Sequence, residues 1–249
     1  MQAIILAGGM GTRLKEVVKD VPKPMAPVNG LPFLEYQINQ LVHWDIKDIV
    51  LSVGFKREII KEYFGNGGRW GVAIRYAEED EPLGTGGAIR EAMRLTTNDS
   101  ILVMNGDSFF NLDVSAFWKF HLQKRAIFSF ALVAMDDTGR YGRIEIDEKG
   151  RVLAFKEKQG NGPGFVNSGV YLVSRNALDY FPPLGAVSLE NDILPGFVGK
   201  RMFALPSSAF FIDIGVPADY QYINANSSFL LPESGFGKSF TRETKSLVP

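Results

Sequence analysis

The sequence contains no cysteine and only two histidines, and it carries no excess of charge of either sign. Without cysteine, neither a disulfide framework nor a thiolate metal site can form. The 27 basic and 28 acidic side chains give a formal net charge of −1, so the chain as a whole has no electrostatic preference for nucleic acid or for an anionic membrane. We therefore expect neither as a partner, and any bound phosphate must be held by local features of the chain.

Long apolar runs are also missing. No stretch approaches the ~18 apolar residues that a membrane-spanning helix needs, and the apolar start of the chain lacks the length, the basic segment and the cleavage site of a signal peptide. We therefore expect a cytoplasmic protein. His43 and His121 lie in helix-like stretches beside apolar residues, which is typical of structural histidines rather than of general bases.

The first half of the chain alternates between strand and helix patterns. Apolar runs at residues 3–7, 48–53 and 101–105 predict buried strands, and a shorter alternating stretch at 72–76 predicts another. Apolar residues at helical spacing separate them, first from Phe33 onward. Such a β-α-β-α series predicts a parallel sheet with helices on both faces.

The second half changes character, because strand patterns follow one another with little helix between them. We therefore predict a three-layer, Rossmann-like α/β fold with a mixed, mostly parallel sheet, formed by one domain over residues 1–231. The tail, residues 232–249, has no periodicity, and we expect it to be poorly ordered. The predicted elements of this half are strands at 128–134, 143–147, 151–157, 165–173, 202–205 and 209–214 and a closing helix at 217–229.

A glycine-rich loop follows the first predicted strand directly. Residues 8–14 read Gly-Gly-Met-Gly-Thr-Arg-Leu; the glycines let backbone N–H groups close on an anion, and Arg13 adds a guanidinium suited to phosphate. A Rossmann dinucleotide fingerprint would place a third glycine at Leu14 and an acidic residue after the second strand, where Ser52-Val-Gly54 stands. The loop therefore favours a phosphate site over a dinucleotide site.

Two further segments have the composition of nucleotide-binding loops. Lys23 stands between two prolines, which fix the backbone around it and favour a second phosphate ligand near the first loop. Residues 81–87 read Glu-Pro-Leu-Gly-Thr-Gly-Gly and open a predicted helix. Their glycines could leave room for a flat ring on the backbone, and a helix cap is the alternative explanation.

Two aspartates are candidate metal ligands because of their positions in the sequence. Asp107 follows the strand at 101–105 at its carboxyl end, where open α/β sheets bind their ligands. Asp213 lies in an apolar stretch where an unpaired carboxylate would be costly to bury. Mg²⁺ usually takes one or two protein carboxylates with phosphate oxygens and water, so a shared Mg²⁺ is our hypothesis for both, and satisfaction by loop N–H groups is the alternative for each.

Taken together, these motifs resemble the sugar-phosphate nucleotidyltransferases, in order and over nearly 220 residues. Within that family the chain is most similar to the D-glycero-D-manno-heptose 1-phosphate guanylyltransferases, followed by the mannose 1-phosphate guanylyltransferases and N-acetylmuramate 1-phosphate uridylyltransferases. The segments that carry the resemblance are residues 8–14, 22–24, 82–87, 105–107, 157–158, 167–169 and 213–215.

The resemblance implies a fold of the nucleotide-diphospho-sugar transferase type and an enzyme that joins a nucleoside monophosphate to a sugar 1-phosphate with Mg²⁺ and releases pyrophosphate. Its substrates would be a nucleoside triphosphate, GTP favoured, and D-glycero-α-D-manno-heptose 1-phosphate; a homodimer is one candidate assembly. Many relatives have proline after the Glu157-Lys158 pair, where this chain has Gln159.

The resemblance also assigns roles to residues. Catalysis would fall to Arg13, Lys23, Asp107 and Lys158, and the metal to Asp107 and Asp213. The sugar phosphate would be bound by Asn105, Glu157, Lys158, Asn167, Gly169 and Glu190. The nucleotide would be bound by Leu6, Ala7, Gly8, Gly9, Gly11, Thr12, Arg13, Lys23, Gly84, Thr85, Gly86 and Gly106.

Two functions of other classes are the alternatives. A dinucleotide oxidoreductase would need the acidic residue that is missing after the second strand. A non-catalytic nucleotide sensor would be expected to have lost Lys23, Asp107 or Asp213, and all three are present.

Overall fold

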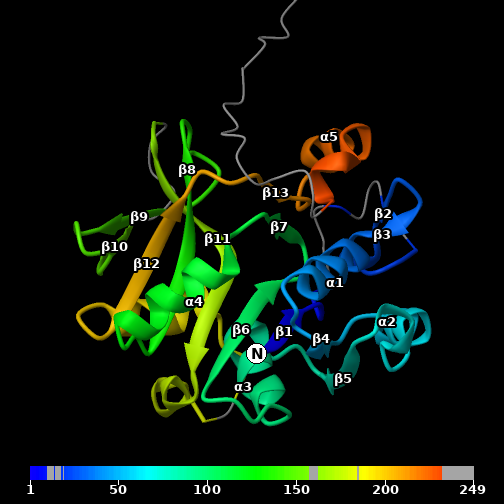
Figure 1. Ribbon diagram of the computed structural model, residues 1–249, viewed down its shortest axis with the longest axis horizontal. Coiled ribbons are helices and arrows are strands. Elements are labelled where there is room, and N and C mark those ends of the chain that lie inside the picture. Colours follow the sequence, from blue (N-terminus) through cyan, green and yellow to red (C-terminus); the bar gives the residue numbers. More distant parts are fainter. Residues whose placement is uncertain (10–13, 15–17, 19, 157–161, 184, 232–249) are drawn as a thin grey trace, which may run out of the picture.

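A nine-stranded sheet forms the centre of the molecule (Figure 1). The computed structural model describes residues 1–9, 14, 18, 20–156, 162–183 and 185–231. The strand order is β10-β9-β11-β6-β1-β4-β5, with β8 and β12 joined to β11 as a branch. Figure 1 shows β9, β10 and β12 on one side of the molecule and β4 and β5 on the other.

The parallel half of the sheet consists of β6, β1, β4 and β5, as the sequence predicts. In register, Ile4 of β1 pairs with Val50 of β4 and with Val103 of β6. Their carboxyl ends therefore meet at one edge, where the predicted binding loops begin. The bounds are β1 (Gln2–Leu6), β4 (Asp48–Val53), β5 (Ala73–Glu78) and β6 (Ser100–Asn105).

The strand β11 (Gly164–Ser174) joins the two halves of the sheet, because it pairs antiparallel with β6, β8 and β9. β12 is parallel to β8, and β10 is antiparallel to β9, so only β11 and β10 run against the other strands. The predicted mixed, mostly parallel sheet is confirmed. The bounds are β8 (Phe128–Met135), β9 (Arg143–Ile146), β10 (Val152–Lys156) and β12 (Met202–Ser207).

Side chains alternate between the two faces of the sheet and fill two separate cores. Ile5 belongs to a core that includes residues of α1, α2 and α4, whereas its neighbour Ile4 belongs to a second core with residues of α3, η5 and η6. The predicted three layers are therefore confirmed. The bounds are α1 (Phe33–His43), α2 (Arg57–Phe64), α3 (Gly84–Met93), α4 (Val114–Gln123), the π-helix η5 (Leu189–Ile193) and the 3-10 helix η6 (Leu194–Phe197). In the described part of the chain, no helix has the length and apolar character to span a membrane.

A small third core lies under a two-stranded sheet of β7 (Ser108–Phe110) and β13 (Phe211–Asp213). The strand predicted at 209–214 is thus shorter than expected and pairs outside the central sheet. The predicted closing helix also ends early, since α5 (Pro217–Ala225) is followed by a separate 3-10 helix. The remaining elements are β2 (Pro27–Val28), β3 (Leu31–Pro32), η2 (Lys23–Met25), η3 (Gly68–Trp70), η4 (Arg175–Tyr180) and η7 (Ser227–Leu230).

His121 is a buried structural residue of α4, as the sequence predicts. Its side chain hydrogen-bonds Ser129 Oγ at 2.8 Å through Nδ1 and Ser174 Oγ at 3.1 Å through Nε2, and the residue is 1% exposed. Burial lowers the pKa of His121 to about 4 because the charged imidazolium would lose its hydration. The ring is therefore neutral in the folded protein at pH 7.

This burial predicts a loss of stability in mild acid. As pH falls below about 6.5, the unfolded chain binds a proton at His121 and the folded chain does not, so unfolding becomes easier. Between pH 7 and 5 this residue alone should lower the free energy of unfolding by about 2 kcal/mol. Urea denaturation at both pH values would measure it. The His121→Gln variant, although less stable at pH 7, should lose less on acidification; an equal loss would contradict the prediction.

Candidate active site

One cavity of about 370 Å³ lies where the carboxyl ends of β1, β5 and β6 meet the start of α3. We call it the central cavity. Segments distant in the sequence contribute to it, as expected at this edge of an open α/β sheet. It is lined by Leu6, Gly8, Gly9, Lys23, Pro24, Glu79, Pro82, Gly84, Thr85, Ala88, Asn105, Asp107 and Gly215.

The first glycine-rich loop begins after the end of β1, at the border of the central cavity. The Ala7 N–H donates to Ser52 O at 2.8 Å, so the chain stays paired with β4 up to that point. Gly8 and Gly9 then line the cavity, whereas Ala7 is fully buried and does not. The remaining predicted residues of this loop, Gly11, Thr12 and Arg13, lie outside the described residues.

Lys23 is the first residue of the short 3-10 helix η2, and its neighbours Pro22 and Pro24 restrict the backbone around it. Its Nζ atom lies 2.6 Å from Asp107 Oδ2 and 3.4 Å from Asp213 Oδ1. The Lys23 side chain is only 9% exposed, so the ammonium is held in place. The structure thus brings together three predicted site residues that are 84 to 190 positions apart in the sequence.

The surroundings of the Asp213 carboxylate change its pKa. Burial and the neighbouring Asp107 carboxylate raise the pKa of Asp213, while Lys23 and the Gly215 N–H act in the opposite direction. The Gly215 N–H donates to Asp213 Oδ1 at 2.6 Å, so part of the loop-donor alternative holds for Asp213. A side chain at Gly215 would put its Cβ 2.8 Å from Asp213 Oδ1 and 2.9 Å from Lys23 Nζ, too close for either atom to stay.

The glycines that open α3 pack closely against a later segment of the chain. Gly84 has φ +69°, and a Cβ there would lie 2.5 Å from Val187 O; a Cβ at Gly86 would lie 2.3 Å from Ile193 Cδ1. Both glycines therefore allow close packing against the segment that leads into η5. Gly84 lines the central cavity, but Gly86 is buried and does not, so the expected room for a flat ring at Gly86 is absent.

A chain of hydrogen bonds connects the start of α3 to β11. Thr85 Oγ1 donates to Glu190 Oε2 at 2.9 Å, and the Tyr171 hydroxyl donates to Glu190 Oε1 at 3.3 Å. Burial raises the pKa of Tyr171 well above its ordinary value, so its hydroxyl stays protonated. Asn167 Nδ2 completes the chain by donating to the Tyr171 hydroxyl at 2.8 Å. Asn167 and Glu190 thus belong to one network behind the cavity wall and do not line the cavity itself.

Asn105 and Gly169 meet where β6 ends beside β11. A Cβ at Gly169, whose φ is +77°, would lie 2.7 Å from Asn105 Nδ2 and 2.8 Å from Ser108 Oγ, so glycine allows Asn105 to approach. Gly106 likewise allows a close approach to β1, because a Cβ added there would lie 2.6 Å from Leu6 O. Of the predicted sugar-phosphate residues, Asn105 lines the cavity; Glu157 and Lys158 lie outside the described residues.

The site residues predicted from the sequence do not include five residues that line the cavity, which are Pro24, Glu79, Pro82, Ala88 and Gly215. The expected strand at 72–76 ended too early, since β5 continues to Glu78. With the correct boundary, Glu79 would have been recognised as the first residue after a parallel strand, in the same position as the loops that follow β1 and β6.

This geometry can be compared with known proteins. A family model described as nucleotidyl transferase matches residues 2–227. The chain belongs to the nucleotidyl transferase family. The dinucleotide oxidoreductase alternative is therefore set aside.

Other nucleotidyl transferases are similar over nearly their whole length. D-glycero-alpha-D-manno-heptose 1-phosphate guanylyltransferase of Campylobacter jejuni is 42% identical over 227 residues, which covers 91% of this chain and 100% of the relative. The protein of the same name from Aneurinibacillus thermoaerophilus is 42% identical over 223 residues, covering 89% and 96%.

Two solved structures are also similar to this protein. The crystal structure of HddC from Yersinia pseudotuberculosis is 36% identical and superposes with a TM-score of 0.82 over 91% of this chain and 99% of that chain. Its complex with GMP-PN is 35% identical and gives a TM-score of 0.81 over the same shares. These matches confirm the Rossmann-like nucleotidyl transferase fold.

The packing of Gly86 yields a prediction for this nucleotidyl transferase. Gly86→Ala should displace the buried Ile193 side chain, because the added Cβ would lie 2.3 Å from Ile193 Cδ1, and it should also press on Val187 O at 3.1 Å. We expect a loss of about 1–3 kcal/mol in the free energy of unfolding and a lower rate of pyrophosphate release. The matched control is Gly196→Ala, whose Cβ meets nothing within 4 Å. Equal stability of the two variants in urea denaturation would refute the packing role.

Proposed function

We propose that the protein transfers GMP from GTP to D-glycero-α-D-manno-heptose 1-phosphate, forming GDP-heptose and releasing pyrophosphate. The observation that carries this proposal is the 42% identity to two relatives of that name over almost their entire length. The complex of the similar HddC with GMP-PN supports a guanine nucleotide as the ligand of this fold.

The residues around Lys23 fit a divalent metal. Asp107 and Asp213 supply two carboxylates that already face one cation, the Lys23 ammonium. Among the described residues, no group of three or more His, Cys, Asp or Glu side chains could hold a metal, so other ligands would be phosphate oxygens and water. This donor set is typical of Mg²⁺. Bound there, Mg²⁺ would stabilise charge on the α-phosphate and on the departing pyrophosphate.

The reaction needs positioning more than proton transfer. A sugar phosphate is already largely a dianion at pH 7, so one of its oxygens can attack the α-phosphorus of GTP without a general base. A new P–O bond forms as the bond to the β-phosphate breaks, and pyrophosphate leaves with the electron pair. The two histidines of the sequence, His43 and His121, both belong to the described residues and do not line the central cavity. Catalysis is then mainly in-line placement and electrostatic stabilisation.

The other site roles extend this proposal. We propose that Lys23 and Arg13 bind the triphosphate, that Gly8 and Gly84 face the nucleotide, and that Lys158 and Glu157 bind the sugar phosphate. Asn167, Gly169 and Glu190 would position the residues that contact the sugar phosphate. Their own contacts support this role, because Asn167 donates to Tyr171, Gly169 lies against Asn105, and Glu190 accepts from Thr85. We further propose a cytoplasmic enzyme without nucleic-acid or membrane partners, with a homodimer as the assembly to test by light scattering.

Substrate panels test the proposal directly. Each of the four ribonucleoside triphosphates would be combined with the heptose, mannose and glucose 1-phosphates, and pyrophosphate release would be followed. We expect the highest kcat/KM for GTP with the heptose. Equal values with UTP would refute the guanylyl assignment. A higher value for mannose 1-phosphate would refute the sugar assignment and leave the class of reaction standing.

A further inference from the structure

The strand β11 contains a bulge beside the central cavity. Between Asn167 and Tyr171 the pairing of β11 with β8 changes register, because β11 has more residues than β8 over this stretch. Gly169, inside the bulge, has φ +77°, and a Cβ there would lie 2.7 Å from Asn105 Nδ2. Asn105 lines the cavity, so the backbone of the bulge borders a cavity side chain. Bulges beside active sites commonly re-aim side chains.

Side chains bind the backbone of this bulge. Asn167 Oδ1 accepts from the Gly169 N–H at 3.0 Å, and Ser168 Oγ accepts from the Val170 N–H at 3.3 Å. The Ser168 hydroxyl is held in turn, because it donates to Ala131 O at 2.8 Å. The Asn167 amide must therefore keep one orientation if the bulge is to keep both of these hydrogen bonds.

The Tyr171 hydroxyl fixes the orientation of that amide. Asn167 Nδ2 donates to the hydroxyl at 2.8 Å, and the hydroxyl donates its own proton to Glu190 Oε1 at 3.3 Å. Tyr171 is fully buried; burial, followed by the charges of the Glu190 and Asp107 carboxylates, raises its pKa well above the ordinary value. A protonated hydroxyl accepts from the amide and donates to the carboxylate at the same time.

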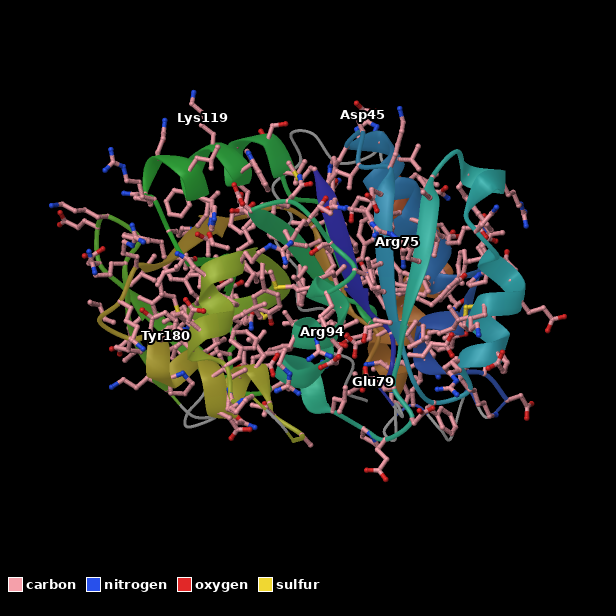
Figure 2. All side chains as sticks on the ribbon, turned by 90° about the horizontal axis from the view of Figure 1, so that it is seen from below. Asp45, Arg75, Glu79, Arg94, Lys119 and Tyr180 are labelled. Carbon is pink, nitrogen blue, oxygen red and sulfur yellow. The ribbon has the colours of Figure 1, made fainter. Side chains whose placement is uncertain are left out.

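The other end of the network reaches the side of the cavity that we propose for the nucleotide. Thr85 lines the cavity together with Glu79, which Figure 2 shows beyond one end of β5. Thr85 Oγ1 donates to Glu190 Oε2 at 2.9 Å and accepts from the Leu189 N–H at 2.7 Å. Neither contact involves Tyr171, so the start of α3 should keep its place without the Tyr171 hydroxyl.

The side of the cavity beside β11 depends on the hydroxyl more strongly. Among the described residues, the Tyr171 hydroxyl is the only hydrogen-bond partner of Asn167 Nδ2, and leaving a partly buried donor without its partner costs free energy. Without the hydroxyl the Asn167 amide can rotate and release the Gly169 N–H.

We propose that Tyr171 is a positioning residue, whose hydroxyl holds the β11 bulge so that Asn105 and Asn167 keep the places that the sugar phosphate requires. This inference rests on the proposed binding of a sugar phosphate at this side of the cavity. It assigns Tyr171 no contact with either substrate, in agreement with its full burial and its absence from the cavity lining.

Tyr171→Phe tests the proposal, because it removes the hydroxyl and keeps the ring. Pyrophosphate release would be followed with GTP and the sugar 1-phosphate that the wild type uses best. KM for the sugar phosphate should rise by about tenfold, the effect of one misplaced hydrogen-bonding group. KM for GTP should stay within about twofold and kcat within about threefold of the wild type, since the start of α3 keeps its contacts.

The matched control is Tyr36→Phe. Tyr36 is 3% exposed, its hydroxyl donates to Val28 O at 3.0 Å, and it does not line the central cavity. This variant should keep both KM values of the wild type. Thermal unfolding of each variant checks that it folds.

A double-mutant cycle shows whether Tyr171 acts through Asn167. Asn167→Ala alone should raise KM for the sugar phosphate. Adding Tyr171→Phe to Asn167→Ala should change that KM by less than about twofold, because the amide that the hydroxyl positions is already gone.

The outcomes separate this inference from the function beneath it. An unchanged KM for the sugar phosphate in Tyr171→Phe, or an equal rise of both KM values, would overturn the inference and leave the proposed function standing. An additive effect in the cycle, or a Tyr171→Phe variant that does not fold, would overturn it as well, because the hydroxyl would then act independently of Asn167 or serve stability alone. If the wild type released no pyrophosphate with any sugar 1-phosphate, the proposed function would fail, and the inference with it.

Discussion

Asp107→Asn is expected to fold and to lose on the order of 10³-fold in kcat, because an interaction of several kcal/mol with the metal-bound transition state is weakened. The substitution keeps the size of the side chain and removes its charge. In the structure Asp107 lines the central cavity, and its Oδ2 atom lies 2.6 Å from Lys23 Nζ, which also lies 3.4 Å from Asp213 Oδ1. Steady-state pyrophosphate release at several Mg²⁺ concentrations would measure the effect.

The control for this variant is Asp45→Asn, which makes the same change at an exposed residue paired with Lys47. Asp45 has φ +55°, a conformation that asparagine also tolerates. The control should keep wild-type turnover. Near-normal kcat of Asp107→Asn at ordinary Mg²⁺ would refute the assignment of Asp107 to the metal.

Lys23→Ala is expected to lower kcat by about 10²- to 10³-fold while changing KM for GTP much less. The reason is that negative charge grows on the phosphates in the transition state, and interactions that strengthen there affect kcat. Lys23 is held for this role by its flanking prolines and by two carboxylates. Full steady-state kinetics with varied GTP at saturating sugar phosphate would separate the two constants.

Lys47→Ala provides the comparison, because it removes a lysine that is 63% exposed and remote from the cavity lining. Its kinetics should match the wild type. A Lys23→Ala variant in which only KM rises, with kcat intact, would show that Lys23 holds the ground state and the transition state equally, contrary to our assignment.

The sequence predicts the parallel half of this fold well, because β1, β4 and β6 are buried on both faces and appear as short apolar runs. The strand at 48–53 agrees with β4 residue for residue. The convergence of Lys23 and Asp107 was also predictable, since Asp107 follows β6 at the carboxyl edge of the sheet and Lys23 lies between prolines near the first loop. Asp213 belongs to β13, outside the central sheet, and was grouped with them by the hypothesis of a shared metal.

Features that depend on tertiary packing were not predictable in this way. The network from Thr85 to Asn167 passes through Tyr171 and Glu190, and no local pattern couples residues so far apart. The π-helix η5 also has no periodic signature in the sequence. Glu79 was missed for a simpler reason, because a two-residue error in the end of β5 moved it from the sheet edge into an ordinary loop.

The single strand β11 has a consequence for how such an enzyme can diversify. Its residues from Val170 to Ser174 pair with β6, its first residues pair with β9, and β8 pairs with it along most of its length. The hairpin of β9 and β10 is therefore joined to the early part of β11 and, through the bridge between Arg151 and Phe203, to β12. Among the described residues, neither strand of the hairpin pairs with β1, β4 or β6. Insertions or substitutions in the hairpin can thus accumulate without altering the register of the strands whose carboxyl ends border the central cavity.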